Sequence, residues 1–66
     1  MPYARNDDLP DSVRHALPPH AQDIFREAFN SAFQEYGGRE ETAFRVAWAA
    51  VKKRYRKVGR EWVEKE

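Results

Sequence analysis

The sequence predicts a mainly α-helical domain with one short helix and two long ones, the long pair forming a helical hairpin. Two observations support this prediction. Apolar residues recur every three to four positions along most of the chain, and prolines and glycines divide this pattern into three segments. With 66 residues, the chain is expected to form a single domain over residues 1–66. An extended tail could also pair with the extended N-terminal segment around Tyr3, as a minor β element.

The short helix is predicted to begin at Pro10 and to end at Leu17. Proline suits the first helical position, because the N–H that it lacks would have no partner there. Pro18 disfavours helical geometry in the residue before it, so the helix stops. The apolar side chains of this segment fall at helical spacing: Val13, Ala16 and Leu17. So short a helix needs to dock against the rest of the domain.

The second helix is predicted from Pro19, which again suits the first position, to the pair Gly37-Gly38. An unbroken apolar stripe runs along it at helical spacing: Ala21, Ile24, Phe25, Ala28, Phe29, Ala32, Phe33 and Tyr36. Small residues alternate with large ones, which suits close helix packing. Glycine adopts the left-handed conformation that ends a helix without a Cβ clash, so the helix stops there.

The third helix is predicted to begin near Glu40 and Glu41, which favour the positive end of the helix dipole, and to break at Gly59. Its apolar residues cover an arc of about 200°, which indicates contacts on two sides: Ala43, Phe44, Val46, Ala47, Trp48, Ala50, Val51, Tyr55 and Val58. The short glycine connection predicts an antiparallel pairing with the second helix. Trp62 is expected to fold back onto a core that includes Phe25, Phe29 and Trp48.

Charge is distributed unevenly although the net charge is only +1. Residues 1–41 contain four Lys or Arg against eight Asp or Glu, a net of −4. Residues 42–66 contain eight against three, a net of +5. The two halves could neutralise each other within the fold, or the basic half could attract an acidic partner. Cysteine is absent, and no stretch approaches the roughly 20 apolar residues of a membrane span. We expect a soluble, cytoplasmic protein without a signal peptide.

The residues from 52 to 60 include six cations and no anion. Five of them are expected on the outward side of the third helix and form the candidate interaction surface: Lys52, Lys53, Arg56, Lys57 and Arg60. This surface could be an ordinary solvated helix face, a contact for a partner protein or membrane, or a set of phosphate contacts to nucleic acid. Arg54 differs, because helical geometry places it within the apolar arc. It is expected to extend its stem outward or to meet an acidic side chain, the candidates being Asp7, Asp8, Asp11 and Glu35.

The sequence contains no clear pattern of catalytic or metal-binding residues. The chain has no cysteine, no recognisable Ser-His-Asp arrangement and no glycine-rich phosphate loop. Asp11 and His15 share a helical face, but prolines separate His20 from them, and a metal site needs three or four converging ligands. A surface ion pair or a cap is the simpler interpretation. We expect no enzyme activity, no cofactor and no bound metal.

Several motifs together resemble the ChaB family of cation transport regulators. They are Met1-Pro2-Tyr3, Asp8-Leu9-Pro10-Asp11-Ser12-Val13, Leu17-Pro18, His20-Ala21-Gln22-Asp23-Ile24-Phe25, Ala28-Phe29-Asn30-Ser31-Ala32, Arg39-Glu40-Glu41-Thr42-Ala43, Val46-Ala47-Trp48-Ala49-Ala50-Val51-Lys52 and Trp62. The resemblance implies a small helical protein with a minor β element. It also implies a regulator of a cation/proton antiporter, a membrane protein that it would contact on the cytoplasmic side. It offers no catalytic residue.

One departure from the family pattern concerns the connection between the long helices. Family members often carry a longer charged segment there, whereas this chain has only Gly37-Gly38. A contact made through that segment would be missing here. The resemblance therefore favours a non-enzymatic regulatory or protein–protein interaction role. The alternative is a small nucleic-acid-binding protein that uses the basic face of the third helix.

Overall fold

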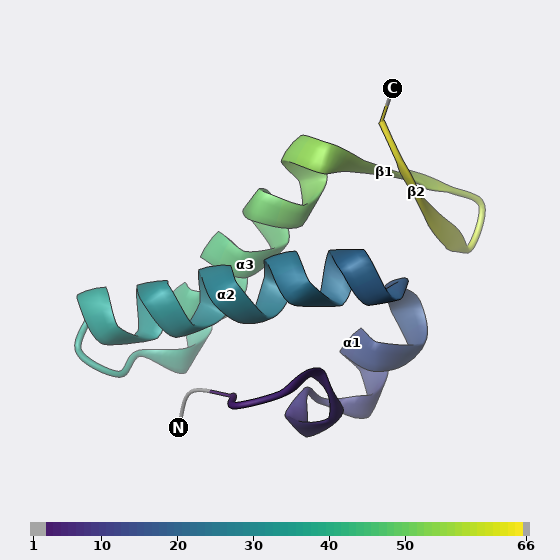
Figure 1. Ribbon diagram of the computed structural model, residues 1–66. Coiled ribbons are helices and arrows are strands. Elements are labelled where there is room, and N and C mark those ends of the chain that lie inside the picture. Colours follow the sequence, from purple (N-terminus) through teal and green to yellow (C-terminus); the bar gives the residue numbers. More distant parts are fainter. Residues whose placement is uncertain (1–2, 66) are drawn as a thin grey trace.

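The computed structural model describes residues 3–65 and confirms the predicted fold class (Figure 1). The elements are the 3-10 helix η1 (Asn6–Asp8), the helices α1 (Asp11–Ala16), α2 (Pro19–Glu35) and α3 (Glu40–Arg54), and the strands β1 (Tyr55–Val58) and β2 (Glu61–Glu64). Helix α3 returns across α2 to form the predicted hairpin, and the N-terminal segment with η1 and α1 lies along the other side of α2. The two strands project from the end of α3.

Prolines and glycines set the helix ends close to the predicted positions. Helix α1 begins at Asp11, one residue later than predicted, with Pro10 as its N-cap, and Leu17, which precedes Pro18, is extended with φ −113° and ψ 137°. Pro19 occupies the first turn of α2. At the other end of α2, Gly37 has a left-handed φ of 69°, and the Gly38 N–H donates to the carbonyl of residue 33 at 2.7 Å. This pair of features is typical of a glycine-terminated helix.

Aromatic side chains run through the core from the N-terminal segment to the C-terminal strands. We call the ring contacts that join the N-terminal segment to β2 the aromatic row: Tyr3, Phe29, Phe44, Phe25, Trp48 and Trp62. Ring centroids along the row are 4.9 to 5.9 Å apart. Between the two long helices, fully buried alanines such as Ala21, Ala43 and Ala47 let the backbones approach. The expected fold-back of Trp62 is confirmed by its packing on Trp48 at 5.7 Å.

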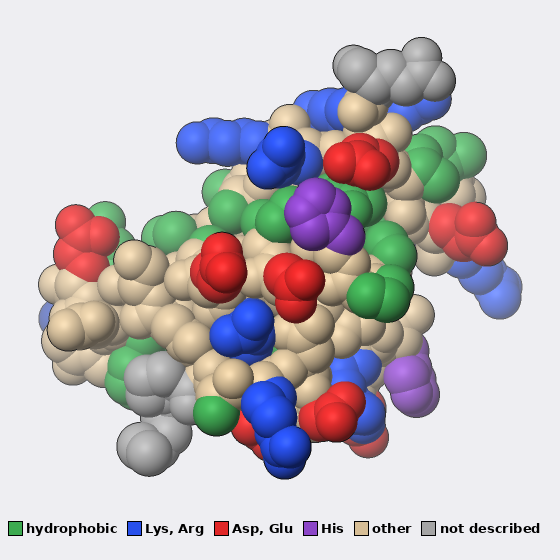
Figure 2. Space-filling view, in the orientation of Figure 1, with side chains coloured by type: hydrophobic (Ala, Val, Ile, Leu, Met, Phe, Trp, Pro, Cys, Tyr) green, Lys and Arg blue, Asp and Glu red, His purple; other side chains and the backbone are tan. Residues whose placement is uncertain are grey.

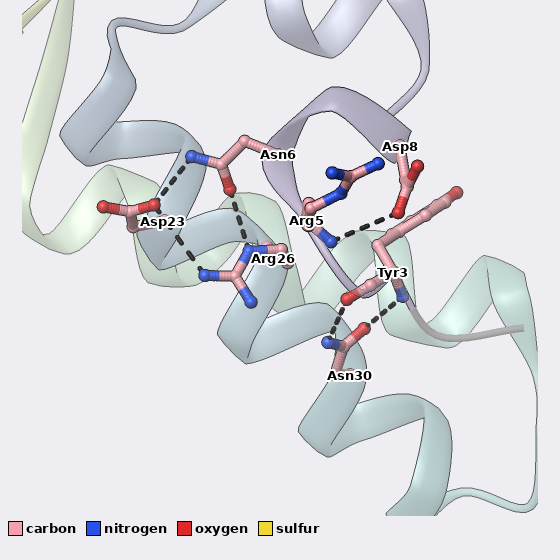
Figure 3. Close-up of polar contacts among 7 residues, drawn as sticks. All are labelled: Tyr3, Arg5, Asn6, Asp8, Asp23, Arg26 and Asn30. Atoms are coloured by element: carbon pink, nitrogen blue, oxygen red, sulfur yellow. Dashed lines mark hydrogen bonds and ion pairs between the residues drawn. The ribbon is translucent and has the colours of Figure 1, made fainter.

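The predicted β pairing between the tail and the segment around Tyr3 is wrong. The side chain of Asn30 on α2 binds both backbone groups of Tyr3: Oδ1 accepts from its N–H at 2.8 Å, and Nδ2 donates to its carbonyl at 2.7 Å (Figure 3). Those are the groups that a neighbouring strand would have paired. A second bridge joins η1 to α2, since Asn6 bonds to Asp23 at 2.7 Å and to Arg26 at 2.8 Å. The N-terminal segment is therefore fastened to α2.

The β element instead lies entirely at the C-terminus, where α3 ends at Arg54 rather than at the predicted Gly59. Strands β1 and β2 pair antiparallel, with Tyr55 opposite Glu64 and Lys57 opposite Trp62. Gly59 makes the sharp reversal possible because it adopts a φ of 62°. A turn at this point returns Trp62 to Trp48 and lets Tyr55 be buried, with 4% of its surface exposed.

Some apolar residues predicted for the core are exposed. Val58 is 49% exposed because it lies on β1 rather than on a continued α3. Val46 on α3 is 36% exposed, since its side of the helix is not covered by another element in the described chain. Tyr36 is 48% exposed at the C-terminal cap of α2. The other aromatic residues predicted for the core are buried or half-buried.

Candidate interaction surface

The predicted interaction residues lie at one end of the molecule but on three different elements. Lys52 and Lys53 belong to the last turn of α3, Arg56 and Lys57 to β1, and Arg60 to the turn between the strands. All five are exposed. With the equally exposed Arg54 they form what we call the basic surface. Figure 2 shows Lys and Arg side chains gathered over the end of α3 and the adjoining strand. The prediction that one face of the third helix carries these cations is wrong, because α3 ends at Arg54.

Of the two alternatives predicted for Arg54, the ion pair is wrong, and the outward extension agrees with its exposure. Its side chain is exposed, and within residues 3–65 it makes no ion pair with the four acidic candidates. Arg54 stands at the junction where α3 becomes β1, and its carbonyl accepts the N–H of Lys65 at 2.8 Å. The chain leaves helical geometry at this residue, so the apolar arc extrapolated from the helix does not continue past it.

The ion pairs of residues 3–65 do not neutralise the basic surface. Three of them each join two residues of the same helix, three or four positions apart: Asp11 with Arg14, Asp23 with Arg26, and Glu41 with Arg45. The fourth joins His20 to Glu64, with 3.9 Å between Nδ1 and Oε2. In this part of the chain, none of the six cations of the basic surface is in an ion pair. Neutralisation of the basic half by the acidic half therefore does not occur through these residues.

Asp11 pairs with Arg14 rather than with His15, the residue that shares its helical face. The hydrogen bond from the Arg14 guanidinium, together with its charge, lowers the pKa of the Asp11 carboxyl below its ordinary value. Asp11 is fully exposed, so this pair has little weight in stability. His15 itself is exposed on the last turn of α1.

The hairpin that carries half of the basic surface is held to α2 by a polar contact as well as by Trp62. The Tyr55 hydroxyl lies 3.1 Å from His20 Nδ1, and the two rings meet edge to face. Burial of Tyr55 raises the pKa of its phenol, and the nearby Glu64 carboxylate raises it further. Tyr55, His20 and Glu64 thus form a small polar cluster between the first turn of α2 and the paired strands. Sequence reasoning missed it, because it placed Tyr55 on a helix.

We expect the protein to lose stability as the pH rises past about 10, the ordinary pKa of tyrosine. The pKa of Tyr55 is higher in the folded state than in the unfolded state, so the folded state favours the neutral phenol. The stability gained in this way is complete below the pKa of tyrosine in the unfolded chain. It is lost as the pH rises through the pKa of Tyr55 in the folded protein. Urea unfolding at neutral and alkaline pH measures the decline. Tyr55→Phe removes the phenol, so its decline should be shallower; an identical decline in this variant would contradict the assignment.

Two open grooves adjoin the basic surface. The larger, of about 430 Å³, runs between the long helices, with an apolar floor and charged rims. Its lining residues are Ile24, Glu27, Ala28, Ser31, Ala50, Lys53 and Arg54. The smaller, of about 290 Å³, lies between the α1–α2 connection and the strand turn and includes His15, Arg60 and Trp62. Apolar side chains of the larger groove therefore lie next to two cations of the basic surface, Lys53 and Arg54.

Neither a metal cluster nor a membrane-spanning helix is found among residues 3–65. No three His, Cys, Asp or Glu side chains gather there in a way that could hold a metal ion. No helix in that range is long and apolar enough to cross a bilayer.

Comparison with known proteins agrees with the resemblance seen in the sequence. The model of the ChaB family matches residues 9–65, which is most of the chain. The chain belongs to the ChaB family. ChaB-family relatives from Escherichia coli (strain K12) and Shigella flexneri are 56% identical to it, over 86% of this chain and 87% of theirs. Both are described as "Putative cation transport regulator ChaB". A solved NMR structure of a ChaB protein superposes with a TM-score of 0.88 at 51% identity, covering 98% of this chain and all of the other.

Proposed function

We propose that this chain is a non-enzymatic regulatory protein that contacts a membrane cation/proton antiporter on its cytoplasmic side. The observation that carries the proposal is its identity of 56%, over most of both chains, to relatives named as regulators of cation transport. The shared fold makes the same kind of role reasonable here. The names of these relatives do not describe an enzyme.

The surface geometry supports a role in binding. The basic surface and the groove between α2 and α3 meet at Lys53 and Arg54, so an apolar contact area and positive charge lie side by side. A partner segment with apolar and acidic side chains would match both features. We therefore place the contact with the antiporter at the basic surface and the adjoining groove.

The nucleic-acid alternative does not fit the structure in the form stated, with the basic face of the third helix as the binding surface. It required a basic face along the third helix, yet only Lys52, Lys53 and Arg54 of the basic surface lie on α3. The other cations of the basic surface follow the paired strands and their turn. The six cations therefore do not lie along one helix that could contact nucleic acid.

Cation tolerance of a strain that lacks the gene tests the proposal. We expect deletion to alter growth at high cation concentration and the wild-type gene to restore it. The triple variant Lys52→Gln, Lys53→Gln, Arg56→Gln should fail to restore it, because it removes half of the basic surface. The control is Arg5→Gln, Arg39→Gln, Arg45→Gln, which removes the same charge from exposed positions elsewhere and should restore growth. A deletion without any effect on tolerance would contradict the proposal.

A further inference from the structure

We propose that the basic surface, together with Val58, binds the anionic headgroups of a lipid bilayer. This inference rests on the proposed function, since it names a partner for the same surface. Binding to headgroups would concentrate the protein at a membrane before the same surface contacts a membrane protein. The inference depends on the charge of the surface, on the exposed Val58 and on the fixed position of the hairpin.

The charge of the surface is available to a partner. Six cations lie within residues 52–60, all of them are exposed, and none takes part in the ion pairs of residues 3–65. Two carboxylates on β2, Glu61 and Glu64, reduce the local positive charge, and Glu64 is directed to His20. Clusters of four to eight Lys or Arg are typical of surfaces that bind anionic lipid.

An exposed apolar side chain lies among these cations. Val58 is 49% exposed and directly precedes the turn that carries Arg60. Side chains alternate between the two faces of a strand pair. The register places Val58 and Arg56 on one face, together with their cross-strand partners Glu61 and Val63. The other face carries the buried Tyr55 and the half-buried Trp62. The face with Val58 is therefore the one that does not cover the core.

The paired strands hold this arrangement in a fixed orientation. An isolated two-stranded hairpin is marginal in water, but this one is fastened by the Trp48–Trp62 contact and by the hydrogen bond between Tyr55 and His20. Val58 and Arg56 thus keep a fixed position on one face of the hairpin, whereas Lys57 lies on the other face with Trp62. Little ordering would be needed on binding, which favours affinity.

A bilayer surface matches these features better than nucleic acid does. The headgroup region binds cations electrostatically and accepts apolar side chains at its boundary with the acyl chains. Phosphates of a duplex would attract the same cations, but Val58 would have to reach base edges within a groove to make an apolar contact. The cations also lie on a helix end and a strand pair rather than along one helix. The combination of a cationic rim and an exposed valine favours lipid.

Flotation with vesicles of phosphatidylglycerol and phosphatidylcholine, compared with pure phosphatidylcholine, tests this inference. We expect binding to the anionic vesicles alone. Each cation removed should weaken it about fivefold, so Lys52→Gln, Lys53→Gln, Arg56→Gln should weaken it about a hundredfold. The control triple Arg5→Gln, Arg39→Gln, Arg45→Gln should bind like wild type. Val58→Ser should bind about threefold more weakly, whereas Tyr36→Ser, at a similarly exposed apolar position, should not.

Several results would overturn the inference. They are failure to bind anionic vesicles, equal weakening by the two triple variants, no effect of Val58→Ser, or tighter binding to duplex DNA than to the vesicles under the same salt conditions. The vesicles contain no antiporter, so a failure here leaves the cation-tolerance test of the proposed function unaffected. Circular dichroism of each variant shows whether it is folded before binding is measured.

Discussion

Replacing Phe25 with alanine is expected to remove a large share of the stability of the fold. Phe25 has no exposed surface, and its ring contacts Phe29, Phe44 and Trp48, so it joins both long helices. Removal of a buried phenylalanine costs about 3–5 kcal/mol. Domains have a stability of only about 0.05–0.15 kcal/mol per residue. For a chain of 66 residues this range amounts to about 3–10 kcal/mol, so the loss is a large share of the total.

Urea unfolding followed by tryptophan fluorescence measures this effect. Tyr36→Ala is the control, because Tyr36 is an aromatic residue at the end of the same helix but is 48% exposed. It should change the free energy of unfolding by less than about 0.5 kcal/mol. A Phe25→Ala protein with a transition close to that of wild type would show that Phe25 does not occupy the centre of the core.

Trp62→Ala is expected to release the paired strands while the helices remain folded. Trp62 is the residue of β2 in the aromatic row, and its ring lies on that of Trp48 at 5.7 Å. A fully buried tryptophan replaced by alanine costs about 3–5 kcal/mol, and Trp62 is half-buried, so we expect a loss of about 2 kcal/mol. Without this contact the hairpin has little stability of its own.

Amide hydrogen exchange, resolved by residue, separates local release from global unfolding. In Trp62→Ala the amides of β1 and β2 should exchange much faster, whereas amides in the middle of α2 should change less. Val58→Ala is the matched control, since Val58 lies on the same hairpin but is 49% exposed. Uniform acceleration throughout the chain, or no change in the strands, would contradict the role given to Trp62.

The helices could be predicted because their signals are local. Pro18, Pro19 and the glycines at 37 and 38 act on their own backbone and on the residue before them, so they set helix ends without knowledge of the rest of the fold. The apolar spacing of α2 likewise describes one face of one element. The antiparallel helix pairing followed from the short connection.

The hairpin could not be predicted because its local sequence also fits a helix. Tyr55 and Val58 are three residues apart, and together with Val51 they continue the helical spacing of α3. The contacts that favour strands are distant in sequence: Tyr55 with His20, and Trp62 with Trp48. Gly59 was recognised as a break, but a break alone does not distinguish a helix end from a strand turn. Similarly, nothing local indicated that Asn30 would bind the backbone of Tyr3.

The exposure of the cations in the candidate site could be predicted, but their arrangement could not. Lys52, Lys53 and Arg56 were expected on the outward side of a third helix, and they are exposed. They lie partly on a helix and partly on a strand because α3 ends at Arg54. The prediction missed this end because it continued the helix to Gly59. Val58 was predicted on the apolar arc of the third helix for the same reason, but it is exposed. The lipid contact proposed for Val58 could be inferred only from the strand register.

The most direct test of the regulator role is cation/proton exchange in everted membrane vesicles from cells that lack the gene. Purified protein is added to the exposed cytoplasmic side, and proton movement is followed as the cation is supplied. We predict that wild-type protein and the control triple Arg5→Gln, Arg39→Gln, Arg45→Gln change the exchange rate equally. We predict that Lys52→Gln, Lys53→Gln, Arg56→Gln leaves it at the rate seen without protein. An exchange rate unaffected by saturating wild-type protein would contradict the proposed function.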